Sequence, residues 1–150
     1  MRLRLLDLFK AWAPVALWLA SIFFASTEVL SSEHTSRFLT PFLQWIAPGI
    51  SEPTVAQIHF LIRKLAHLTE YAILAGLLLR ALRRSTPGSR RAVAIAIVAT
   101  VLIAIADEYH QSFVPSRTPT LGDVAIDSAG ALLGVLLFRR PFLSLEVAKN

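Results

Sequence analysis

Four long runs of hydrophobic residues, separated by polar segments, dominate the pattern along the chain. A helix needs about 20 mostly apolar residues to cross the hydrocarbon core of a bilayer, and these runs reach or approach that length. The pattern therefore predicts an all-α, polytopic membrane protein with four transmembrane helices in a single domain, residues 1–150. The expected spans are residues 11–30, 56–82, 91–107 and 121–138.

The first run also resembles a cleavable signal peptide, because Arg2, Arg4 and Lys10 precede its apolar stretch. The pair of small residues that cleavage needs is poorly formed, however. The segment from Pro14 to Leu30 is also long enough for a permanent anchor. We therefore expect the first run to remain in the membrane.

Breaks in the hydrophobic pattern delimit the other three spans. Thr54 and Gln57 have the spacing of a capping box, which predicts the start of a helix near Thr54. Pro87 lies in a short turn after the second run, and a polar link from Asp107 to Thr120 follows the third. Pro141 closes the fourth run.

The segment between the first two spans, residues 31–53, carries apolar side chains at helical spacing. These residues are Phe38, Leu39, Phe42, Leu43 and Ile46, with Pro41 between them. The stripe suits a short helix that lies on the membrane surface. A hydrophobic loop packed on the helix bundle explains the same residues, so both interpretations stay open.

Composition supports the membrane interpretation. Hydrophobic residues make up 55% of the chain and charged residues 17%, whereas soluble domains average about a quarter charged. The chain has no cysteine, which excludes disulfides, thiolate metal sites and cysteine nucleophiles.

The charges explain the basic isoelectric point of about 10.4 without a nucleic-acid partner. Eleven of the 15 bases fall on one side of the four spans, beside only two acids, Asp7 and Glu146. The other side and the adjoining helix halves hold four bases and the remaining eight acids. By the positive-inside rule, both termini and the link between the second and third spans are expected in the cytoplasm.

Several ionisable residues of the last three spans are expected at a common depth. At about 1.5 Å per residue from the cytoplasmic charges, they lie about 18–24 Å up, inside a hydrocarbon core of about 30 Å. These residues are His67, Glu70, Asp107, Asp123 and Asp127. A charge facing lipid costs at least about 2.5 kcal/mol, so this layer is expected to face inward.

The polar residues also share faces of their helices. His59, Arg63, His67 and Glu70 form one arc of the second span, with Lys64 and Tyr71 at its edge. Asp107 and Gln111 align on the third span, and Asp123, Asp127, Gly130 and Gly134 form one stripe on the fourth. The spacing of Gly130 and Gly134 is that of a close-packing motif between membrane helices.

The charges have two interpretations. In the first, Arg63, Lys64 and Arg117 only neutralise buried carboxylates and orient the helices. Buried ion pairs stabilise less well than apolar packing, which makes so large a network an inefficient architectural device. In the second, the layer is a functional site, the default expectation for ionisable groups within a membrane.

The ordered motifs resemble those of the VanZ-like family of membrane proteins over about residues 26–134. The motifs are Arg63-Lys64-x-x-His67-x-x-Glu70-Tyr71, Asp107-Glu108-x-x-Gln111, Pro115-x-Arg117, Asp123 and Gly130-x-x-x-Gly134. The resemblance implies a multi-pass protein of the bacterial cytoplasmic membrane and cell envelope. The founding member is associated with low-level resistance to teicoplanin, an antibiotic that carries a lipid. The family often has asparagine where this chain has Asp127.

Three functions are compatible with these residues. The first is a polar cavity that binds an anionic lipid, or a lipid-linked or acylated amphiphile, at the outer leaflet. Its ligand-binding candidates are Arg63, Lys64, His67, Glu70, Tyr71, Asp107, Glu108, Gln111, Arg117, Asp123 and Asp127.

The second is a membrane-embedded enzyme that acts on a lipid headgroup, and the third is a small proton-coupled carrier. In the enzyme, Glu70, Asp107, Glu108, Asp123 and Asp127 would hold a divalent ion while His67 acts as acid or base. No recognised metal signature is present, so we expect no metal and no cofactor. The pattern assigns neither catalytic residues nor an oligomeric state.

Overall fold

The computed structural model describes residues 5–28, 32–85, 89–117 and 119–147 of the chain. These residues form five helices and no strand. The helices are α1 (Leu5–Ala25), α2 (Ser32–Ile46), α3 (Glu52–Ser85), α4 (Ser89–Gln111) and α5 (Leu121–Val147). The segments Leu5–Ala25, Glu52–Ser85, Arg90–Gln111 and Leu121–Phe138 are long and apolar enough to cross a membrane. The all-α fold with four candidate spans is therefore confirmed.

The helix bounds differ from the expected spans at several points. Helix α1 begins earlier than the predicted span 11–30, since its first turns include the polar residues Asp7 and Lys10. It also ends earlier, at Ala25. Residues 29 and 30 of that span lie outside the described residues. Helix α4 continues to Gln111, so the start of the expected polar link is helical.

The start of α3 also differs from the predicted capping box. Ser51, not Thr54, lies just before the helix, and its Oγ accepts a 3.4 Å hydrogen bond from the backbone N–H of Thr54. Pro53 occupies the first turn, where a missing backbone N–H costs nothing. The sequence Ser-Glu-Pro-Thr therefore begins the helix slightly earlier than expected.

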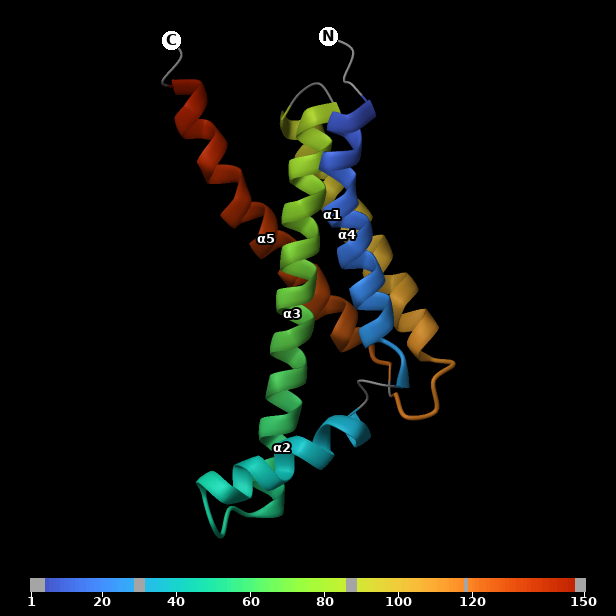
Figure 1. Cartoon of the computed structure of the whole chain (residues 1–150), viewed down its shortest axis with the longest axis vertical. Coiled ribbons are helices and arrows are strands. Elements are labelled where there is room, and N and C mark those ends of the chain that lie inside the picture. Colours follow the sequence, from blue (N-terminus) through green and yellow to red (C-terminus); the bar gives the residue numbers. More distant parts are fainter. Residues whose placement is uncertain (1–4, 29–31, 86–88, 118, 148–150) are drawn as a thin grey trace.

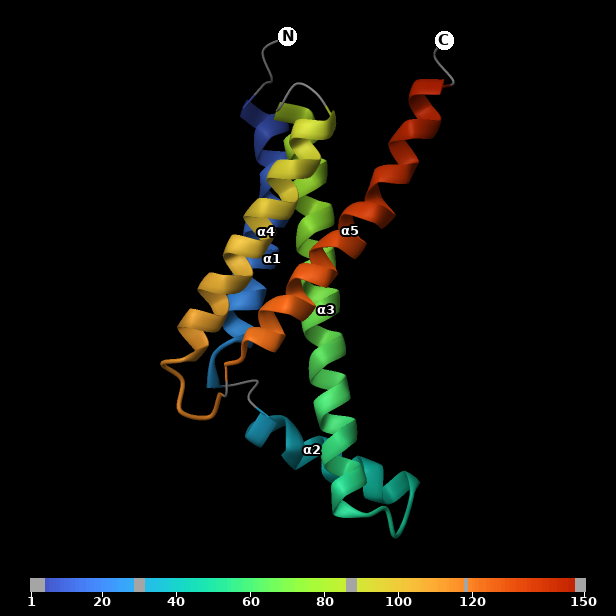
Figure 2. The same ribbon diagram turned by 180° about the vertical axis from the view of Figure 1, so that it is seen from behind.

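Helix α3 is the centre of the molecule and packs against each of the other helices, most extensively against α5. The start of α1, the end of α3, the start of α4 and the end of α5 lie at one end of the molecule (Figure 1). Helix α2 lies across the opposite end, beside the first turns of α3 (Figures 1 and 2). Helix α5 slopes across α3, and its last part diverges from the bundle (Figure 2).

Small residues dominate the buried core between the spans. Ala75, Ala81, Ala96 and Ala104 are completely buried, and Leu74 is buried among them. Such residues let helix backbones approach closely, as is common in membrane helix bundles. Large apolar side chains point outward instead, among them Leu17, Leu65, Val98, Leu102 and Leu137. An apolar outer surface and a close-packed interior fit a bilayer as the solvent.

Helices α5 and α3 approach each other closely at Gly130 and Gly134. A Cβ atom at Gly130 would collide with the backbone carbonyl of Leu68, and one at Gly134 with that of Ala72. Both helices run in the same direction along this contact, so their faces stay together over several turns (Figure 1). The two glycines therefore hold the polar faces of α3 and α5 together.

The segment between α1 and α3 forms a helix, which agrees with the first of its two interpretations. Phe38, Phe42 and Trp45 of α2 are exposed, whereas Leu39 and Leu43 are partly covered. Pro41 lies within the helix. Its position at the membrane surface stays a prediction.

Substitution of Gly134 by alanine is expected to destabilise the bundle by about 1–3 kcal/mol, because the new methyl group overlaps a backbone carbonyl that cannot rotate away. Thermal unfolding in detergent micelles measures the loss. Gly122→Ala is the matched control, since a Cβ atom there meets only Thr120 Oγ1 at 3.4 Å, an ordinary contact. Equal unfolding temperatures for the two variants would contradict the close contact.

The predicted orientation can be tested because the chain contains no cysteine. Met1, Pro87 and Asn150, which we expect in the cytoplasm, lie outside the described residues, so Ser85 represents that side. A membrane-impermeant thiol reagent should label Ser51→Cys in intact cells, and Ser85→Cys only after permeabilisation. The opposite pattern would reverse the topology that the bases indicate.

Candidate functional site

Two polar contacts, one helical turn apart, join α3 to α5 within the membrane-spanning region. Lys64 Nζ forms an ion pair with Asp123 Oδ1. His67 Nδ1 and Asp127 Oδ1 are 3.1 Å apart and share a hydrogen bond. His67, Asp123 and Asp127 are buried, Asp127 completely. The stripe predicted on the fourth span therefore meets the arc predicted on the second.

The start of α5 holds Asp123 in place through a local motif. Thr120 precedes the helix, and its Oγ1 accepts a 3.1 Å hydrogen bond from the backbone N–H of Asp123. The same hydroxyl donates to Asp123 Oδ2 at 3.1 Å. The backbone N–H of Thr120 donates to Glu108 Oε2 at 3.0 Å, which connects the end of α4 to this cap. The capping residue thus orients two carboxylates.

A second chain of hydrogen bonds runs from α4 to α3. Gln111 Nε2 donates to Asp107 Oδ2 at 2.9 Å, one turn away on the same helix. Gln111 Oε1 accepts a 3.4 Å hydrogen bond from Arg63 Nη2. Asp107 and Gln111 are both buried. The predicted pair therefore faces the interior of the bundle, as expected from the cost of exposing a charge to lipid.

Arg117 reaches the site from the loop between α4 and α5. Its Nη2 donates to the backbone carbonyls of Ala25 and Thr27, the latter at 3.0 Å. Burial lowers the pKa of Arg117 and the neighbouring cation Arg63 lowers it further, whereas nearby carboxylates raise it. The Nε–H of Arg117 is buried and has no hydrogen-bond partner within the described residues. Arg117 thus retains an unused donor near a second guanidinium.

These groups surround a cavity of about 220 Å³. The predicted site residues that line it are Arg63, His67, Glu70, Gln111 and Arg117. Apolar and small residues from three helices complete the wall, namely Ala25, Ser26, Leu39, Ile62 and Ala66, together with Thr35 and His59. The cavity therefore has a charged part and an apolar part.

The other predicted site residues are not among those that line the cavity. Lys64 and Asp123 neutralise each other. Tyr71 is completely buried in the hydrophobic core cluster, not in the cavity wall. Asp107 borders a separate apolar cavity of about 360 Å³ between α1 and α4. The structure thus divides the predicted set into lining residues and supporting residues.

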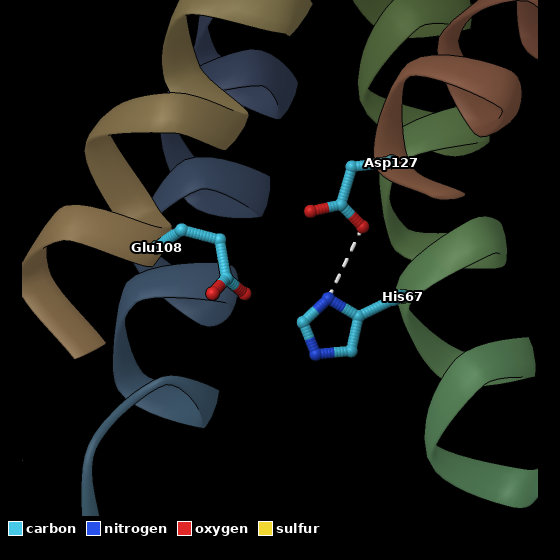
Figure 3. Close-up of side chains that lie close together, drawn as sticks. All are labelled: His67, Glu108 and Asp127. Carbon is cyan, nitrogen blue, oxygen red and sulfur yellow. Dashed lines mark hydrogen bonds and ion pairs between the residues drawn. The ribbon is translucent and has the colours of Figure 1, made fainter. Parts of the chain in front are cut away.

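Three of the buried groups also approach one another closely. His67, Glu108 and Asp127 each offer one ligand atom, and these atoms lie within 4.8 Å of one another. Their side chains converge from α3, α4 and α5 (Figure 3). A nitrogen and carboxylate oxygens at this separation can hold a metal ion.

Some contributors to the site carry a weak sequence signal or none. Trp18 donates a 2.9 Å hydrogen bond from its indole nitrogen to the backbone carbonyl of Glu70, and no pattern in the first span indicates it. The carbonyls of Ala25 and Thr27 are backbone groups that any residue supplies. Thr120, by contrast, precedes Asp123 by three residues, which is recognisable as a capping motif.

Fold and site together define a multi-pass helical membrane protein with a charged cavity between its spans. Residues 11–144 match the family model described as VanZ/LLP1. This chain belongs to the VanZ/LLP1 family, as the motif resemblance implied. Searches of curated proteins and of solved structures gave no significant match.

Removal of one partner of the Lys64–Asp123 pair is expected to destabilise the protein, because the other charge stays buried. Lys64→Met should cost about 3 kcal/mol, near the lower end for a buried pair, since the Lys64 side chain is 18% exposed. The double variant Lys64→Met/Asp123→Asn should recover most of that loss. Denaturant unfolding in mixed micelles measures both. Equal losses in the single and double variants would contradict the pairing.

Proposed function

We propose that this protein binds an anionic amphiphile, such as an acidic phospholipid or a lipid-linked cell-envelope molecule, at the outer leaflet. The headgroup occupies the cavity of about 220 Å³, and the acyl chains stay in the surrounding apolar region. The observation that carries the proposal is the lining of that cavity, which combines Arg63 and Arg117 with Leu39 and Ile62.

The size of the cavity favours a headgroup over a whole ligand. Pockets that enclose drug-sized molecules usually measure about 300–1,000 Å³. A cavity of about 220 Å³ accepts a phosphate or carboxylate with its immediate substituents. An apolar cavity of about 360 Å³, lined by Leu19, Phe23 and Ile103, adjoins the site at Asp107 and suits part of an acyl chain.

The electrostatics favour an anion. Two guanidinium groups near each other repel, and the lowered pKa of Arg117 reflects that repulsion as well as burial. An anion between Arg63 and Arg117 reduces this repulsion and accepts a hydrogen bond from the unpartnered Nε–H of Arg117. Guanidinium groups bind phosphate and carboxylate through paired, charge-assisted hydrogen bonds. Glu70 and Gln111 on the same wall suit the hydroxyl groups of a headgroup.

The outer leaflet follows from the predicted topology. The cavity lies at the end of the bundle near α2, opposite the end where most of the described bases gather (Figure 1). If those bases face the cytoplasm, the cavity opens toward the outer leaflet. Thr35 and Leu39 of α2 line its wall, so an α2 that rests on the membrane surface borders the entry.

The family adds a specific consequence for antibiotics. The VanZ-like resemblance connects such proteins with teicoplanin, an antibiotic that carries a lipid. We infer that this chain alters teicoplanin susceptibility by binding the antibiotic or a lipid that it requires. The inference concerns acylated glycopeptides only, so vancomycin, which has no acyl chain, serves as the comparison.

Arg117→Ala is expected to weaken the binding of phosphatidylglycerol by about tenfold to a hundredfold, the equivalent of one charge-assisted hydrogen bond. Arg117→Lys should restore only part of the affinity, because a point charge cannot replace a planar fork. Titration of the purified protein with short-chain phosphatidylglycerol, followed by native mass spectrometry, measures the affinity. Phosphatidylcholine is the neutral comparison lipid.

Arg84→Ala is the matched control, because it removes the same charge from an exposed position at the other end of α3. It should leave phosphatidylglycerol binding unchanged. Equal losses for the two alanine variants would indicate binding to net charge alone and would overturn the assignment of the cavity.

In a susceptible Gram-positive host, expression of the wild type should shift teicoplanin inhibition but not vancomycin inhibition, and Arg117→Ala should abolish the shift.

A further inference from the structure

The carboxylates of the site differ in how fully their oxygens are used. Both oxygens of Asp123 have partners, Lys64 and Thr120. Gln111 donates to Asp107 Oδ2. Glu108 Oε1 and Asp127 Oδ2, by contrast, are buried and have no hydrogen-bond partner within the described residues. Buried carboxylate oxygens without a partner are costly, so these two require a cation or a proton.

The two unpartnered oxygens belong to residues that share a third neighbour, His67. Asp127 is completely buried, Glu108 is 6% exposed and His67 is 6% exposed. The three side chains point toward one another across the interior of the bundle, and the His67 ring lies on the same side as Asp127, opposite Glu108 (Figure 3). Each comes from a different helix, so tertiary packing brings them together.

We propose that His67, Glu108 and Asp127 form a binding site for one divalent transition-metal ion. The ligand atoms lie within 4.8 Å of one another. Ions that bind at about 2.0–2.2 Å hold their ligands about 3–4 Å apart, so small side-chain rotations close the site. An imidazole nitrogen with two carboxylate oxygens suits Zn²⁺ better than Mg²⁺ or Ca²⁺, which prefer oxygen alone.

Access and charge agree with this assignment. His67 also lines the cavity of about 220 Å³, so an ion can enter through it, and water can complete the coordination from that side. Lys64 already neutralises Asp123, whereas Glu108 and Asp127 bring two negative charges to the point where they approach His67. A divalent cation at that point balances these two charges.

Metal binding and lipid binding can be tested separately, because the metal site does not depend on the proposed ligand. The full chain, purified with a histidine-free tag and treated with a chelator, is titrated with Co²⁺ and then with Zn²⁺ in the absence of added lipid. We expect one Co²⁺ per chain with visible d–d absorption, displacement by Zn²⁺, and a higher unfolding temperature with metal bound.

Glu108→Gln and Asp127→Asn should each weaken Zn²⁺ binding by at least about a hundredfold, because each removes a charged ligand and keeps the shape. Asp107→Asn is the matched control. It removes a neighbouring buried charge whose oxygen already accepts from Gln111, and it should bind Zn²⁺ like the wild type. Circular dichroism and size-exclusion profiles of the metal-free variants verify that each is folded.

Three results would overturn the metal site. One is a folded wild type that takes up no Co²⁺ or Zn²⁺. Another is an equal loss of affinity in all three variants, which would indicate diffuse charge attraction. The third is unchanged affinity in Glu108→Gln and Asp127→Asn, which would move binding to the other histidines, His34, His59 or His110. Loss of phosphatidylglycerol binding alone would leave the metal site standing.

Discussion

The contact between α3 and α5 is the constraint on which the rest of the structure depends. One stripe of α5 carries Asp123, Asp127, Gly130 and Gly134, and the facing residues of α3 are Lys64, His67, Leu68 and Ala72. The glycines let the backbones meet, and this proximity lets two buried carboxylates find a lysine and a histidine. In a bilayer these carboxylates have little water to solvate them, so packing and charge pairing require each other.

The fold was largely predictable because a bilayer imposes simple rules on sequence. Four apolar runs, their basic flanks and the turn residues were sufficient for an all-α protein with four spans. The helix ends were harder to locate, since backbone hydrogen bonding does not stop where hydrophobicity does. Helix α1 includes Asp7 and Lys10, and α4 continues through Asp107 to Gln111, because helical residues can be polar when partners or water are within reach.

The site was predictable as a set of residues but not as a set of contacts. Helical periodicity placed Arg63, His67 and Asp127 on inward faces, yet it could not distinguish the lining of a cavity from its support. Tyr71 belongs to the apolar core, and Lys64 is paired with Asp123. The carbonyls that hold Arg117 come from the end of α1 and the turn after it, which leaves no side-chain signal. The approach of Glu108 to His67 and Asp127 depends on how three helices pack.

An experimental structure of the protein in a phosphatidylglycerol nanodisc tests the central claim most directly, because it observes the α3–α5 contact and the cavity together. The account predicts α3 and α5 in contact at Gly130 and Gly134, with a headgroup phosphate within hydrogen-bond distance of the Arg63 and Arg117 guanidinium groups. A cavity filled by side chains, with Arg63 and Arg117 turned away from each other and no lipid density between them, would contradict it.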